Sequence, residues 1–167
     1  QPDGCDMNDE TWSPTALSRV ASKIGSGATP RGGKDSYQAE GISLIRSLNV
    51  YNFKFERNAL AFIDDAQAAQ LKNVKVQSGD ILLNITGASV ARCCMVPESV
   101  LPARVNQHVA ILRVDETKAH NKFVYYSINS PHYKHHLLAL AQGGATREAL
   151  TKQTIENFEI LLPKLST

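Results

Sequence analysis

His132, His135 and His136 carry side chains that could bind a metal ion. Their i, i+3 and i+4 spacing would place all three on one face of a helix, and neutral imidazole is a common zinc ligand. A metal site also needs further ligands that converge on the ion and neighbours that orient them. No cysteine or carboxylate lies nearby in the sequence. We therefore expect an exposed helix surface here, and no metal site.

Glu116-Thr117-Lys118 resembles the acid-x-Lys half of a Mg²⁺-dependent nuclease site. Such a site needs another carboxylate to hold the ion, and Asp80 is the only plausible upstream candidate. The run follows a predicted strand, where a charged turn is the simpler interpretation. The sequence contains no Walker A loop, no Gly-x-Ser-x-Gly elbow, no His-Glu-x-x-His helix and no Asn/Asp-Pro-Pro-Tyr/Phe motif. We expect a chain without catalytic activity, and keep the Asp80, Glu116 and Lys118 nuclease as an alternative.

Two glycine-containing segments could serve binding. Residues 25–34 combine small residues and hydroxyls with Arg31 and Lys34, which suits a close approach to phosphates. Composition alone favours an ordinary surface connection there. Residues 79–92 are predicted to form a strand, a tight glycine turn that exposes Ser89, and a second strand that includes Arg92. Taken alone, this pattern indicates a structural hairpin.

The bulk composition indicates one soluble globular domain. The chain has 167 residues, of which 43% are hydrophobic and 20% charged. It contains no apolar run of roughly 20 residues, the length needed to cross a membrane. The net charge of +2 leaves nucleic-acid binding open. Cys5, Cys93 and Cys94 form no disulfide framework, which predicts a reducing cytoplasm.

The elements that would position these residues alternate between helices and strands. Ser13-Pro14 is predicted to open an amphipathic helix that continues through Leu17 and Ile24 to Gly25. Further helices are expected at residues 64–72, 122–129, 130–142 and 151–157, and strands at 42–46, 81–86, 90–96, 108–114 and 158–162. We therefore predict an α+β fold, with a polar leader at residues 1–12 and a single mixed domain at 13–165. Its twisted β-sheet would be mainly antiparallel and accompanied by several short helices.

In order along the chain, these segments resemble the target-recognition domain of type I restriction–modification DNA specificity subunits. The matching residues are Trp12 and Leu17, then 27–30, 42–47, 79–89, 105–109, 144–151 and 155–158. The segment Gly-Asp-Ile-Leu-Leu-Asn-Ile-Thr-Gly-Ala-Ser at 79–89 is close to the most recognisable string of that family. Leu44 replaces the usual Trp, and Leu48-Asn49 stands where Gly-Asp is common. These departures flank a variable region and concern the DNA sequence that is read.

The resemblance implies a DNA-binding chain without catalysis of its own. It would read one half of a bipartite site in double-stranded DNA. Partner methyltransferase subunits would hold S-adenosylmethionine and methylate adenine, and a restriction subunit would use ATP and Mg²⁺. The full-length subunit would add long spacer helices, which this chain lacks, and a second recognition domain. Two alternatives remain: the same domain within a single-chain methyltransferase–nuclease, and a protein-interaction adaptor that does not contact DNA.

Candidate DNA contacts follow from side-chain chemistry. Lysines anchor phosphates, here Lys23, Lys34, Lys54, Lys72 and Lys152. Arginine can donate two hydrogen bonds to guanine, which selects Arg31, Arg46, Arg92 and Arg147, and carboxamides can read adenine, which selects Gln38, Asn52 and Gln142. Thr29, Arg57, Ser89 and Thr146 complete the predicted DNA-binding set. Ser89, together with Thr86, Asn106 and Gln107, could instead hold loops in place, because residues shared by domains that read different sequences are poor sequence readers.

Overall fold

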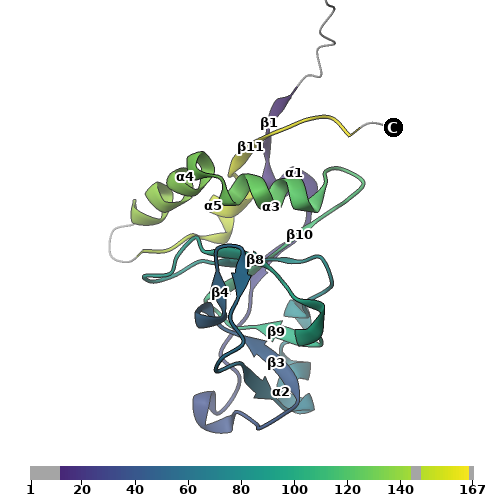
Figure 1. Ribbon diagram of the computed structural model, residues 1–167. Coiled ribbons are helices and arrows are strands. Elements are labelled where there is room, and N and C mark those ends of the chain that lie inside the picture. Colours follow the sequence, from purple (N-terminus) through teal and green to yellow (C-terminus); the bar gives the residue numbers. More distant parts are fainter. Residues whose placement is uncertain (1–11, 144–147, 166–167) are drawn as a thin grey trace, which may run out of the picture.

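The computed structural model describes residues 12–143 and 148–165 (Figure 1). At its centre is a four-stranded sheet in the order β2 (Ala21–Ser26), β10 (Val109–Val114), β7 (Ile81–Asn84) and β8 (Cys93–Met95). All neighbouring strands in this sheet are antiparallel. None of the helices within the described ranges combines the length and apolar character that a membrane span requires.

Both faces of the central sheet are buried. Ile81 and Leu83 belong to one apolar cluster, whereas Leu82 belongs to a second cluster on the opposite face. Cys93 and Cys94 divide between the two clusters in the same way, as side chains alternate along a strand. Burial of both faces explains why β7, β8 and β10 have almost continuous apolar sequences.

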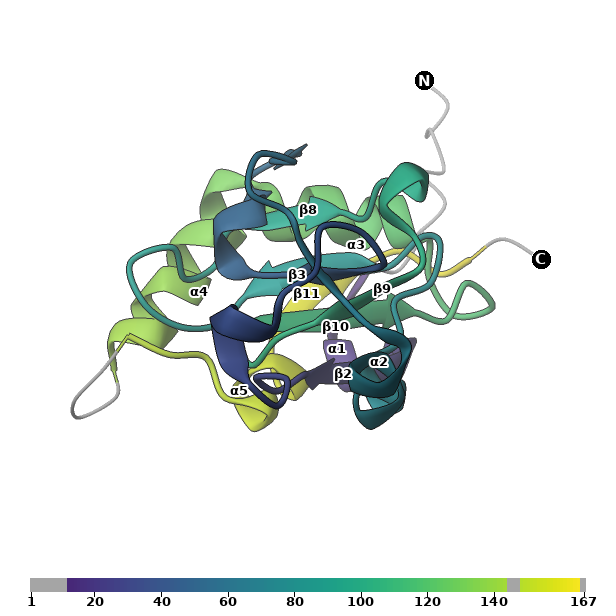
Figure 2. The same ribbon diagram turned by 90° about the horizontal axis from the view of Figure 1, so that it is seen from below.

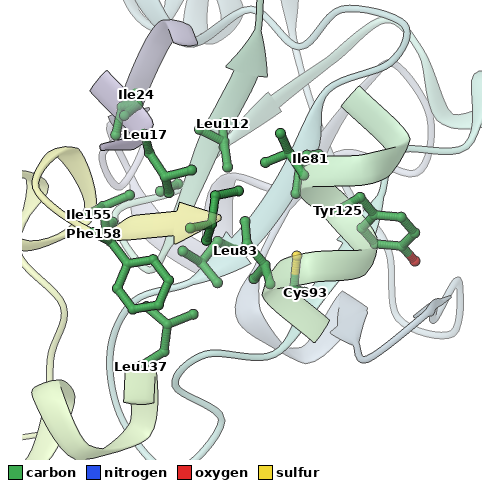
Figure 3. Close-up of a cluster of buried hydrophobic side chains, with 14 of the residues drawn as sticks. Leu17, Ile24, Ile81, Leu83, Cys93, Leu112, Tyr125, Leu137, Ile155 and Phe158 are labelled. Carbon is green, nitrogen blue, oxygen red and sulfur yellow. The ribbon is translucent and has the colours of Figure 1, made fainter. Parts of the chain in front are cut away.

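Helices and a two-stranded ribbon cover the first face. They are α1 (Leu17–Val20), α3 (Asn121–Asn129), α4 (Pro131–Gln142), α5 (Lys152–Glu156), β1 (Ser13–Ala16) and β11 (Glu159–Leu162) (Figure 1). Figure 3 shows how Leu17, Leu137 and Phe158 meet Leu83 of the sheet in this cluster. The predicted helices at 122–129, 130–142 and 151–157 are confirmed, and the Thr151 hydroxyl caps α5 by accepting a hydrogen bond from Thr154 N at 3.1 Å.

A smaller layer covers the second face. It contains the sheet β6 (Ala61–Ile63), β3 (Ile42–Ile45) and β9 (Ala103–Val105), with α2 (Asp65–Gln70) and the 3₁₀ turns η3 (Lys72–Val74) and η4 (Glu98–Val100). The hairpin β4 (Val50–Tyr51) and β5 (Lys54–Phe55) and the turns η1 (Gly33–Ser36) and η2 (Ser47–Asn49) complete it. Figure 2 views this layer from below. Strands β3 and β9 are parallel, and the other strand pairs are antiparallel, so the predicted α+β class is confirmed.

The predicted helix from Ser13 to Ile24 is wrong. Residues Ser13–Ala16 form β1, the helix is limited to Leu17–Val20, and β2 begins at Ala21. The reason is pairing with distant parts of the chain: β1 pairs with β11 and β2 with β10. Leu17, Val20 and Ile24 are nevertheless all buried in the first cluster. Their spacing therefore reported burial correctly and backbone conformation incorrectly.

The predicted tight turn between the strands of residues 79–92 is also wrong. Strand β7 ends at Asn84 and β8 begins at Cys93, so residues 85–92 form a loop between them. Asn84 N donates to Arg92 O at 2.9 Å, and Ala91 N donates to Asn84 O at 2.8 Å, which closes the loop at its base. Within the expected leader, residues 1–11 lie outside the described ranges, and the Trp12 ring packs on Phe123 with centroids 5.6 Å apart.

Candidate nucleic-acid interface

Loops that are far apart in the sequence meet on one side of the molecule and form a groove. One hollow of about 150 Å³ is lined by Thr29, Lys34, Tyr37, Arg46, Asn106, Gln107 and His108. A second, of about 430 Å³, is lined by Ser47, Leu48, Tyr51, Thr86, Gly87, Ala88, Ser89, Arg92 and His108. Because His108 lines both hollows, we treat them as one groove. The loop 85–92 and the turns η1 and η2 lie along this side, which is the left in Figures 1 and 2.

Three cationic side chains line the groove, and two of them lie over aromatic rings. The guanidinium carbon of Arg92 lies 4.5 Å from the centroid of the Tyr51 ring, and that of Arg46 lies 5.3 Å from the centroid of Tyr37. Lys34 lines the groove beside Tyr37 and is exposed. Arginine stacked on an aromatic ring keeps its N–H donors at the edge of the guanidinium plane. The groove thus presents positive charge and directed donors together.

Asn84 connects the loops on both sides of the groove. It is fully buried at the end of β7. Its side-chain amide donates to Ser47 O at 2.9 Å and to Ser89 Oγ at 3.1 Å. One buried carboxamide therefore joins η2 to the loop 85–92. Because the Asn84 side chain is fully buried, loss of these hydrogen bonds would leave its amide nitrogen unpaired.

Further carboxamides hold the other groove segments. Asn106 is buried, and its Oδ1 accepts a hydrogen bond from His108 N at 3.0 Å. Gln67 of α2 donates to Arg31 O at 3.0 Å and to Ser36 Oγ at 2.8 Å. Residues 27–38 are therefore tied to α2. Asn106 and Ser89 are placed as the scaffold interpretation expects, since both take part in hydrogen bonds that shape loops.

At the start of the loop 27–38, the chain passes so close to β9 that Gly27 has no space for a side chain. A methyl group on Gly27 would overlap the carbonyl group of Val105. Gly27 N donates to Asn106 O at 2.9 Å in the same place. This glycine is thus required by close backbone approach, not by turn geometry.

The structure brings only part of the predicted DNA-binding set together. Thr29, Lys34, Arg46, Ser89 and Arg92 line the groove. Exposed residues outside its lining are Arg31, Gln38, Asn52, Lys54, Arg57, Lys72 and Gln142. Lys23 and Lys152 line a separate hollow of about 330 Å³ beside β2 and α5. Thr146 and Arg147 lie outside the described residues.

Several predicted contact residues already bind groups within the protein. Asn52 Oδ1 accepts a hydrogen bond from Cys93 N at 3.2 Å. Lys54 Nζ lies 3.5 Å from Glu56 Oε2. Arg46 Nη2 donates to Ala59 O at 2.6 Å. These contacts reduce the donors and acceptors that remain for a ligand, most clearly for the carboxamide of Asn52.

Sequence reasoning missed Tyr37 and Tyr51 as groove residues and did not include His108 in the predicted set. Thr86 Oγ1 and His108 Nδ1 lie 2.5 Å apart and share a hydrogen bond. His108 falls within the matched block 105–109, so the resemblance contained a signal for it. Nothing in the local sequence marks the two tyrosines. Each lies beside an arginine from another part of the chain, Tyr37 beside Arg46 and Tyr51 beside Arg92.

The arrangement around Asp80 does not form the alternative nuclease site. Asp80 is fully buried, and its two carboxylate oxygens accept hydrogen bonds from Arg113 Nε and Nη2, both at 2.8 Å. Gln77 N also donates to Asp80 Oδ2 at 2.8 Å. Lys118 lies 4.0 Å from Asp115 rather than beside Asp80. Both oxygens that would hold an ion are committed to an internal ion pair.

The three histidines of α4 are exposed, as the helix-surface interpretation expects. His132 packs on Tyr133 with ring centroids 5.0 Å apart, and His136 packs on Phe158 at 5.1 Å. In the part of the chain that the structure describes, no group of three or more histidine, cysteine, aspartate and glutamate side chains is placed to hold a metal ion.

Comparison with known proteins relates this arrangement to a family. Residues 9–167 match the model of the "Type I restriction modification DNA specificity domain". No curated protein sequence matches the chain.

The fold is similar to that of solved specificity subunits. A structure from a study of complex assembly and conformational transition of the type I R-M system gives a TM-score of 0.67 at 20% identity, covering 99% of this chain and 37% of that one. The HsdS subunit from Thermoanaerobacter tengcongensis gives a TM-score of 0.64 at 17% identity, covering 98% of this chain and 36% of that one. The S subunit of a type I restriction–modification system from M. genitalium gives a TM-score of 0.63 at 14% identity, covering 98% of this chain and 37% of that one. This chain therefore spans little more than a third of the length of those structures, and it belongs to the family of type I restriction–modification DNA specificity domains.

Proposed function

We propose that this domain recognises one half of a bipartite site in double-stranded DNA for a type I restriction–modification complex. The observation that carries the proposal is the groove, in which Lys34, Arg46 and Arg92 gather from separate loops within a chain of the specificity family. Lysine would anchor phosphates and so set the register, and arginine would read base edges. Each mismatched base pair would then cost about 1–3 kcal/mol of binding free energy.

The other parts of the complex would supply the chemistry. Methyltransferase subunits would bind S-adenosylmethionine and methylate adenine, and a restriction subunit would use ATP and Mg²⁺. We assign the recognition domain to residues 13–165, and the full-length subunit would add spacer helices and a second recognition domain. The contribution of this chain is differential affinity for DNA sequences.

Charge-matched variants of the full-length subunit, assembled with its methyltransferase, test the groove. The double variant Lys34→Gln/Arg92→Gln removes two groove cations. Lys118→Gln/Lys122→Gln removes two cations from the β10–α3 connection and the start of α3, which lie on the right in Figure 1. DNA affinity is measured by fluorescence anisotropy over a series of salt concentrations.

We expect the groove variant to lose at least tenfold in affinity, with a smaller salt dependence because fewer counterions are released on binding. The control should retain the affinity of the unmodified complex. Equal losses in both variants would show that DNA does not bind in the groove. Lys23→Gln/Lys152→Gln, in the same assay, tests whether that separate lysine pair contacts phosphates.

A further inference from the structure

We propose that Arg92 reads a guanine in the DNA and that Tyr51 is the residue that positions Arg92 for this contact. The inference rests on the proposed function and adds to it the identity of one base and the pair of side chains that selects it. Tyr51 carries no prediction from the sequence, and the structure places it on the groove beside Arg92.

The backbone of Arg92 is held at the base of its loop. Arg92 N donates to Ser89 O at 3.2 Å, and Arg92 O accepts a hydrogen bond from Asn84 N at 2.9 Å. The ammonium group of Lys134 in α4 donates a hydrogen bond to the carbonyl group of Ala91. Cys93, the next residue, begins β8 of the central sheet. The side chain of Arg92 therefore starts from a backbone that is bonded to both the sheet and a helix.

Tyr51 belongs to a hairpin that is docked on the edge of the same sheet. Phe53 N donates to Cys93 O at 3.0 Å, and Asn52 Oδ1 accepts from Cys93 N at 3.2 Å. The Phe53 ring packs edge-on against Tyr125 of α3, with centroids 5.5 Å apart. These contacts fix the β4–β5 hairpin beside β8. The half-exposed ring of Tyr51 is thus an anchored platform at the groove.

The guanidinium of Arg92 differs from those of Arg46 and Arg113 in what it is bonded to. It stacks on Tyr51 at 4.5 Å, and within residues 12–143 and 148–165 it has no hydrogen bond or ion pair. Arg46 Nη2 donates to Ala59 O, and Arg113 is paired with Asp80. Arg92 therefore combines a fixed position with donors that remain available. Such preorganisation lowers the entropy lost when a ligand is bound.

Guanine is the base that matches these donors. Its major-groove edge presents O6 and N7, two acceptors that a planar guanidinium can bind with parallel hydrogen bonds. A lysine ammonium at the same place could neutralise a phosphate but would lack this paired geometry. Substitution of lysine for Arg92 thus separates base reading from simple charge.

The test uses the full-length subunit assembled with its methyltransferase, and maps methylated adenines in genomic DNA. Arg92→Lys should make one G·C position of one half-motif degenerate, with discrimination there reduced about 10- to 100-fold, and leave the other half-motif intact. Tyr51→Leu should relax the same position. Tyr51→Phe, which keeps the aromatic platform, should retain the original motif.

Four outcomes would overturn the inference: an unchanged motif in Arg92→Lys, an unchanged motif in Tyr51→Leu, a half-motif without a G·C pair, or a uniform loss of methylation in Arg92→Gln that Arg92→Lys restores, as expected for a phosphate contact. If Tyr51→Leu fails to fold, Tyr51→Gln, which also removes the aromatic ring at this half-exposed position, takes its place in the test. Failure here leaves the proposed function standing when transfer of the whole domain still changes one half-motif. Failure of that transfer rejects the proposed function itself.

Discussion

At the scale of single residues, the ion pair between Asp80 and Arg113 joins the start of β7 to the neighbouring strand β10 of the central sheet. The Asp80 side chain has no exposed surface, and the Arg113 side chain is 21% exposed. Breaking a buried pair by removing one partner leaves an uncompensated charge in a medium of low polarity. This carboxylate, which could have been mistaken for a metal ligand, therefore acts within the structure of the domain.

We predict that Arg113→Gln lowers the free energy of unfolding by about 3–5 kcal/mol, measured by urea denaturation. Asp80→Asn/Arg113→Gln should recover part of this loss, because it removes both charges. Lys118→Gln, which disrupts the more exposed pair with Asp115, is the matched control and should leave the urea midpoint unchanged. If Arg113→Gln is as stable as the control, the ion pair does not support the sheet.

At the scale of elements, the attachment of the loop 27–38 to α2 is expected to affect both the stability of the domain and its DNA binding. Gln67 is buried at the third position of α2, where its backbone N donates to Asp64 Oδ1 at 2.8 Å. Its side chain also holds the loop 27–38 through Arg31 O and Ser36 Oγ. This loop supplies Thr29 and Lys34 to the groove. A helix side chain that does not itself line the groove is therefore expected to affect DNA binding.

Gln67→Ala should destabilise the domain by about 1–3 kcal/mol, because Arg31 O and Ser36 Oγ lose the hydrogen bonds that they accept from Gln67. Hydrogen exchange should become faster in residues 31–38, and DNA affinity should fall. Gln70→Ala, an exposed position on the same helix, is the control and should change neither property. Unaltered exchange in the loop of Gln67→Ala would show that α2 does not hold it.

Elements with local signals were predictable from the sequence. Asp64 and Thr151 cap α2 and α5, which form within the helices expected at residues 64–72 and 151–157, because a capping side chain acts on its own helix. The segment from Ser13 to Ile24 was not predictable in this way. Its conformation is decided by β11 and β10, which follow much later in the chain, and a helical spacing of apolar residues cannot report such pairing.

At the scale of the whole molecule, the groove depends on the fold more than on any motif. Thr29, Arg46 and Arg92 all line the groove because the strands that precede them, β2, β3 and β7, end on the same side, and no local pattern contains that information. The resemblance included segments that line the groove, because Thr29, Arg46 and Ser89 lie within matched blocks. It could not identify which side chains would be bound internally, as Asn52 is.

The most direct test of the central claim transfers residues 13–165 into the corresponding position of a characterised type I specificity subunit. The hybrid is assembled with its methyltransferase, and methylated adenines are mapped in genomic DNA. If this domain reads one half of the target, that half of the methylated motif changes and the other half stays as it was. An active hybrid whose motif is unchanged in both halves would contradict the account.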